Sequence, residues 1–89
     1  MPKMVITHAV ADVDSWLSHK DERAGAIAAL GGSNVVDHAA LDGSNVVAVS
    51  ADVDDVDAMM ATLSSPPPEV AAVMESHGVI PPVTAYVAR

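Results

Sequence analysis

Apolar residues change their spacing early in the chain, and the change predicts a strand followed by a helix. Residues 4–10 are mostly apolar, rich in β-branched side chains and free of breakers, which is typical of a strand buried on both faces. Asp12 or Asp14 then offers a helix cap, and Gly31-Gly32 ends the helix that follows. Between these points the apolar positions recur at helical spacing, at Val13, Trp16, Leu17, Ala24, Ile27 and Ala28.

The rest of the chain predicts a hairpin, two further helices and a last strand. The stretch "DGSN" is a strong hairpin signal between two valine-rich runs. A cluster of aspartates favours a helix start, and "SSPPPE" interrupts that helix. Pro68 suits the first turn of another helix, and Gly78 is well placed just after its end. The expected bounds are strands 34–41 and 46–51, a helix from 52–57 to about 63, a helix 69–77, and a strand 83–88.

This order of elements is that of a ferredoxin-like α+β domain, β-α-β-β-α-β. It predicts one domain, residues 1–89, with an antiparallel four-stranded sheet and both helices on one face. The valines of the hairpin fall on both faces of its strands: Val35, Val36, Val46, Val47 and Val49. The second face of the sheet therefore needs an apolar cover, and a second copy of the same sheet supplies it, which predicts a homodimer.

Composition and charge narrow the classes of partner. The chain carries 12 acidic and 4 basic side chains, and the net charge of −8 disfavours nucleic acid and anionic membrane surfaces. Because cysteine is absent, a disulfide framework, a thiol nucleophile and a thiolate metal site are excluded. No apolar run approaches the length of a membrane span and no leader is recognisable, so we expect a cytoplasmic protein.

Several motifs resemble those of the dimeric α+β barrel superfamily, which includes antibiotic-biosynthesis-type monooxygenases and small polyketide cyclases. The similarity is carried by the join "HAVADVDSW", by Arg23, by the "DGSN" hairpin and by "SPPPEVAAVMESHGV". It implies that two sheets pack face to face and that each subunit keeps a pocket between its sheet and its helices. It also implies that Met4, Ile6, His8 and Val10 point into that pocket, whereas Val5, Thr7 and Ala9 face the partner subunit.

His8 is the candidate catalytic residue of such a pocket. Desolvation favours neutral imidazole, which suits a general base that takes a proton from a phenol or an activated methylene. Trp16, His38, Arg23 and Tyr86 are the candidate ligand-binding neighbours. Trp16 would stack on a flat aromatic ligand and Arg23 would hold an enolate or carboxylate. The alternatives are a core anchor for Trp16 and a solvated surface position for Arg23.

The other three histidines are His38, His77 and His19, and the sequence predicts a position for each. An even-length loop at 42–45 would place His38 on the same face as Val47 and Val49, and hence in one cavity with His8. Their strands would lie about 9–10 Å apart with another strand between them. A shared metal ion would lack a third ligand, so we predict two separately hydrogen-bonded histidines and no metal. His77 is expected to have a structural role at a helix end, and His19 is expected at the surface.

Two hypotheses of function stay open. In the plant polyketide cyclase of the superfamily a Tyr and a His transfer protons, but Thr62 and Pro68 stand at the corresponding places here. The Asn, Tyr, Trp and Arg set of the quinone-forming monooxygenases is not recognisable either. The first hypothesis is a cofactor-free oxygenase or cyclase that acts on a hydrophobic aromatic or polyketide-like metabolite with His8 as base. The second is a non-catalytic dimeric binding or accessory module.

Overall fold

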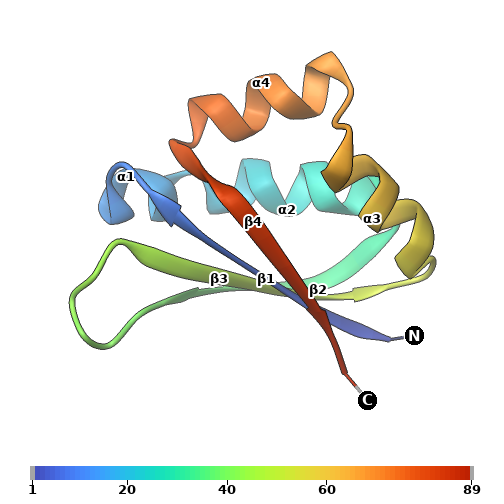
Figure 1. The fold of residues 1–89 in the computed structure, drawn as a ribbon, viewed down its shortest axis with the longest axis horizontal. Coiled ribbons are helices and arrows are strands. Elements are labelled where there is room, and N and C mark those ends of the chain that lie inside the picture. Colours follow the sequence, from blue (N-terminus) through green and yellow to red (C-terminus); the bar gives the residue numbers. More distant parts are fainter. Residues whose placement is uncertain (1, 89) are drawn as a thin grey trace.

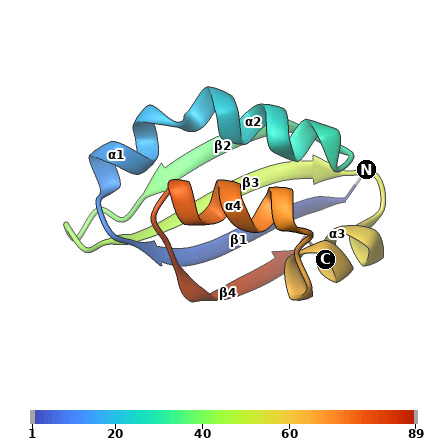
Figure 2. The same ribbon diagram turned by 90° about the horizontal axis from the view of Figure 1, so that it is seen from above.

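The computed structural model describes residues 2–88 and contains one antiparallel sheet covered by helices on one face (Figures 1 and 2). The strands follow the order β2-β3-β1-β4 across the sheet, so β3 lies between β1 and β2 as a ferredoxin-like topology requires. The elements are β1 (Lys3–Val10), α1 (Val13–Ser18), α2 (Lys20–Ala29), β2 (Gly32–Ala39), β3 (Val46–Val53), α3 (Val56–Ser64), α4 (Pro68–Ser76) and β4 (Val79–Val87).

The helices begin where the sequence supplies caps. The side chain of Asp12 accepts a hydrogen bond from the backbone of Ser15 at the start of α1, and Asp55 accepts one from Ala58 at the start of α3. Pro68 occupies the first turn of α4. Gly78, with a φ of 75°, follows the helix end and turns the chain into β4.

The first helix and the last strand differ most from the sequence prediction. The other bounds shift by one or two residues, as in β2, which was expected at 34–41 and is found at Gly32–Ala39. The expected first helix is divided into α1 and α2, because the backbone N–H of His19 bonds to the carbonyl groups of Trp16 and Leu17 and closes α1. The last strand begins at Val79 and includes Pro81 and Pro82, whereas the prediction began after them. The prolines are tolerated there because β4 is an edge strand with unpaired positions.

The core lies between the sheet and the helices. Its most buried large side chains are Met4, Val10, Trp16, Val47 and Val53. In Figure 1, α4 stands further from the sheet than α2 does, and none of its residues is fully buried. The opposite face of the sheet carries no helix among residues 2–88, and several of its large apolar side chains are exposed, namely Val36, Val46, Ile80 and Tyr86. No helix within 2–88 is both long and apolar enough to cross a membrane.

Candidate functional site

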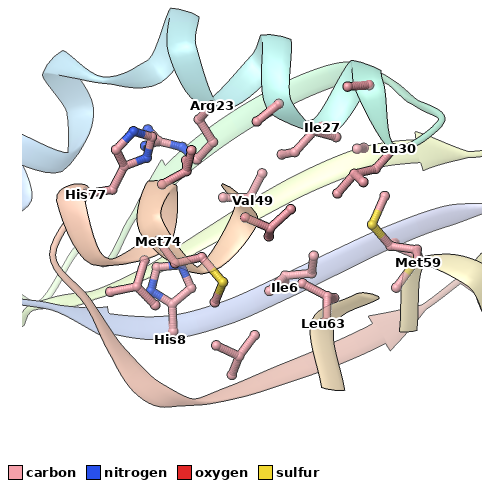
Figure 3. Close-up of a pocket in the computed structure, with 18 of the residues that line it drawn as sticks. Ile6, His8, Arg23, Ile27, Leu30, Val49, Met59, Leu63, Met74 and His77 are labelled. Carbon is pink, nitrogen blue, oxygen red and sulfur yellow. The ribbon is translucent and has the colours of Figure 1, made fainter. Parts of the chain in front are cut away.

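A cavity of about 290 Å³ lies between the sheet and the helices (Figure 3). Its floor is formed by β1 and β3 and its roof by α4, while α2 and α3 close the sides. The roof contributes Val70, Val73 and Met74. The volume is close to the lower end of the roughly 300–1,000 Å³ of small-molecule pockets, and the walls are mostly apolar. The site therefore suits a compact, mainly apolar ligand.

The inward side chains of β1 follow the predicted alternation. Met4, Ile6 and His8 line the cavity, and Val10 is buried beside Trp16. Opposite His8, the pairing of β1 with β4 shifts its register between Thr7 and Ala9. The shift falls at the two prolines of β4, which lack the N–H groups of a regular ladder. Irregularities of this kind are frequent beside active sites.

The backbone fixes which nitrogen of His8 carries the proton. Its Nδ1 lies 3.0 Å from the carbonyl oxygen of Ala9, and because a carbonyl only accepts, Nδ1–H is the donor. In the neutral ring Nε2 then keeps its lone pair, and it has no hydrogen-bond partner among residues 2–88. Burial lowers the pKa of His8, and the Arg23 charge adds to this effect against the opposing bond to Ala9. His8 is thus a neutral base with one free nitrogen.

Trp16 and Arg23 form the polar end of the cavity together. Trp16 is completely buried and meets the His8 ring edge-on, with the ring centroids 6.1 Å apart. The guanidinium of Arg23 lies 3.8 Å from the centre of the Trp16 ring and donates a 2.9 Å bond to the Trp16 carbonyl. It also forms a bidentate pair with Asp37, at 3.1 and 3.0 Å. Arg23 lines the cavity and is buried, so the solvated alternative is wrong; its partners are protein groups.

His77 is a pocket residue that the sequence did not reveal. It caps the end of α4, as expected, but it is only 3% exposed and lines the cavity. Its Nδ1 lies 3.3 Å from Nη1 of Arg23, and its ring stacks on His19 with 4.6 Å between centroids. Its Nε2 lies 3.4 Å from a carboxylate oxygen of Glu22. These partners come from distant parts of the chain, and no local motif signals their meeting.

His38 and Tyr86 lie outside the cavity, which corrects two of the expected neighbours. His38 is directly opposite Ala48 and Tyr86 is directly opposite Val5, so both occupy the open face of the sheet. The hairpin loop holds an odd number of residues, from Leu41 to Asn45, because Ala40 bonds to Val46; the even-length loop assumed from the sequence was wrong. His38 is instead 3.0 Å from the Ser50 hydroxyl.

The potential metal-ligating side chains that come together within residues 2–88 are His19, Glu22 and His77, with donor atoms within 4.8 Å of one another. Their donor types suit zinc. A ligating histidine, however, donates its other N–H to an acceptor. Here the other nitrogen of His77 faces the donor Arg23, so Nδ1 must accept and the ring proton sits on Nε2, the atom a metal would need. The group therefore does not fit a metal site.

Comparison with solved structures relates the fold to antibiotic biosynthesis monooxygenase-like proteins. The chain is similar to SnoaB, a cofactor-independent oxygenase from Streptomyces nogalater, with a TM-score of 0.65 and 19% identity over 99% of this chain and 92% of that one. It is similar to the ActVA-Orf6 monooxygenase of Streptomyces coelicolor, solved with nanaomycin D, at 0.58 and 18% over 98% and 84%. It is also similar to Rv0793 from Mycobacterium tuberculosis, at 0.57 and 16% over 100% and 94%.

At these identities the similarity shows the fold, which is the ferredoxin-like α+β fold of these oxygenases. No protein-family model matches the sequence, and no curated protein matches it either.

Proposed function

We propose that the cavity binds a compact aromatic or polyketide-like metabolite and that His8 removes a proton from it. The observation that carries the proposal is the free Nε2 of a neutral histidine in a mostly apolar cavity. The related fold of a cofactor-independent oxygenase, and of a monooxygenase solved with nanaomycin D, supports this choice of chemistry.

The proton transfer follows from the geometry of His8. A phenol or activated methylene of the ligand lies against Nε2, its O–H or C–H bond breaks, and the proton goes to Nε2 while the electron pair stays on the ligand. Nδ1–H holds the ring through Ala9 throughout this step. The walls around the ligand in this step are mostly apolar.

The subsequent step is of oxygenase type, with dioxygen as co-substrate and no cofactor. At an activated methylene, one oxygen atom becomes the new carbonyl and the other leaves as water with the two methylene hydrogens, so atoms and electrons balance. A cyclase reaction would use the same first proton transfer and join the carbanion to a carbonyl carbon of the same ligand.

Oxidation of 1,8-dihydroxyanthrone to the anthraquinone tests this function. We expect the wild type to accelerate the reaction above the uncatalysed rate, and His8→Ala to reduce that acceleration by about 100-fold or more. His38→Ala, which removes a histidine from the opposite face of the sheet, is the matched control and should retain the rate. The rate of the wild type should fall on acidification with an apparent pKa below 6.5, because burial lowers the pKa of His8. Equal rates for His8→Ala and wild type would exclude His8 as the base.

A non-catalytic binding module is the second candidate. It is favoured by the full use of the Arg23 guanidinium within the protein, which leaves few polar groups for catalysis. In that case 1,8-dihydroxyanthraquinone would raise the melting temperature in a thermal-shift assay, equally in wild type and His8→Ala, without turnover of the anthrone.

We further propose that the chain forms a homodimer through the open face of its sheet. Val36, Val46 and Tyr86 are 48%, 45% and 56% exposed on that face in the single chain. A face-to-face partner would remove this apolar surface from water.

A further inference from the structure

The roof of the cavity is held to the rest of the protein mainly at one end. None of the residues of α4 is fully buried, although Val70, Val73 and Met74 face the cavity. His77, directly after α4, is 3% exposed and is the firmly buried side chain of this segment. At the opposite end α4 follows the prolines Pro66 and Pro67, where no side chain caps the helix. A backbone hydrogen bond of 2.9 Å from the N–H of Ala11 to the carbonyl of Gly78 also fixes this end, and the buried side-chain contacts there are those of His77.

Charged and titratable groups surround His77 on the side away from α4. Arg23 and Glu22 face it from α2, and His19 faces it from the junction of α1 and α2. Asp37 of β2 lies behind Arg23 and pairs with its guanidinium. On α4 itself the titratable residues are Glu69 and Glu75, and both are exposed. Figure 3 shows His77 beside Arg23 at one end of the cavity.

These contacts require neutral His77. A guanidinium only donates, so the 3.3 Å contact with Nη1 of Arg23 needs the lone pair on Nδ1. A second proton on the ring would occupy Nδ1, where two donors would then face each other beside a fixed positive charge. Glu22 favours the charged ring, but its side chain is 55% exposed and its 3.4 Å contact lacks hydrogen-bond geometry. Solvent screening weakens that compensation.

We propose that His77 is a proton-operated latch of the roof helix α4: neutral His77 holds α4 closed over the cavity, and protonation of His77 releases it. Ligand entry and release are thereby coupled to pH in the range in which histidine titrates. The proposal rests on the proposed function only in naming the cavity as the ligand site, because the release of α4 needs no ligand.

The direction of the effect follows from linkage. Burial, Arg23 and His19 lower the pKa of His77 in the closed form against the opposing effect of Glu22, whereas in the open form the pKa returns toward its ordinary value of 6.5. The open form therefore binds the proton more tightly. The equilibrium between the open and closed forms therefore favours closure fully at pH values above 6.5. As the pH falls below 6.5, the equilibrium constant for closure decreases, in total by about tenfold for each unit that separates the two pKa values.

Hydrogen–deuterium exchange of the ligand-free protein tests the latch. After correction for intrinsic rates, the amides of α4 should exchange at least about twofold faster at about pH 5 than at about pH 7.5, while the amides of β1 and β3 keep their protection. His77→Asn retains an acceptor near Nδ1 but does not titrate, so its α4 exchange should not depend on pH. His19→Asn is the matched control and should keep the dependence. Equal dependence in wild type and His77→Asn would overturn the proposal.

Glu22→Gln distinguishes the neutral latch from an ion-pair latch. The Glu22 carboxylate raises the pKa of His77, so its loss should increase the ratio of α4 exchange between acid and neutral pH. If an ion pair between charged His77 and Glu22 held α4 instead, the α4 amides of the wild type would exchange more slowly in acid. In that case Glu22→Gln would lose the pH dependence of α4 exchange. That result would overturn the proposal.

Melting temperatures measured with zinc chloride provide an additional test of the latch. Zinc that raises the melting temperature of the wild type but not of His77→Asn would also overturn the latch, because metal binding at Nε2 needs the other tautomer. An inactive protein whose α4 still opens with acid would refute the proposed oxygenase function and leave the latch standing. An active protein whose α4 does not open with acid would refute the latch and leave the proposed oxygenase function standing.

Discussion

Arg23 shows how far the role of one side chain depends on its partners. Its neighbours in the sequence, Asp21 and Glu22, suggested a solvated position, and the family resemblance suggested a ligand contact. In the structure its guanidinium is buried and is shared among Asp37, Trp16 and His77. A buried charge is tolerated only when it is paired and hydrogen-bonded, so these contacts make Arg23 an organiser of the polar end of the cavity.

Asp37→Asn tests the buried pair. The substitution leaves the Arg23 charge without its carboxylate, and we expect the free energy of unfolding to fall by about 3 kcal/mol, as for other broken buried pairs. Urea denaturation followed by circular dichroism measures this. Asp21→Asn, at an exposed position of α2, is the control and should change stability by less than about 0.5 kcal/mol. Similar losses in both variants would argue against a special role for the pair.

Among the helices and strands, local sequence signals predicted the helix starts correctly and the length of the β2–β3 loop incorrectly. Asp12, one of the two expected caps, begins α1, and Pro68 begins α4 as expected, because capping involves residues close in sequence. The aspartate cluster at 52–57 predicted the start of α3, and Asp55 is the member that caps it. The loop between β2 and β3 was predicted with the wrong parity, and this error moved His38 to the wrong face. A loop length depends on which strand residues pair, and the pairing is decided across the sheet.

The cap of α3 provides a test at this scale. In Asp55→Ala the backbone N–H of Ala58 loses its acceptor, and the free energy of unfolding should fall by about 1 kcal/mol. Asp54→Ala removes a neighbouring exposed aspartate and is the matched control. Thermal unfolding of both variants compares them directly, and equal melting temperatures would mean that the cap contributes little.

For the whole molecule, the cavity and the open sheet face lie on opposite sides of one sheet. The helices cover the first side (Figure 2), and the second bears apolar side chains next to His38 and Ser50. Ligand binding and self-association are therefore proposed for separate surfaces. A change on the open face should alter assembly without altering the cavity directly.

Light scattering tests the homodimer. We expect the wild type to have the mass of a dimer at micromolar concentration, and Tyr86→Asp to be a monomer, because a charge would be buried in each copy of a chain whose net charge is already −8. Leu41→Asp changes a fully exposed residue of the hairpin loop and should remain a dimer. A monomeric wild type would refute the dimer.

The order of the strands, the helix starts at Asp12 and Pro68 and the inward alternation of β1 were predicted from the sequence, because each depends on residues close together in the chain. The sequence also led to His8 and to the ferredoxin-like fold. Three-dimensional packing was needed to show which nitrogen of His8 is free, that Arg23 pairs with Asp37, and that His77 meets Arg23, Glu22 and His19. Those contacts join segments far apart in sequence, and their geometry exists only once the sheet and helices have packed.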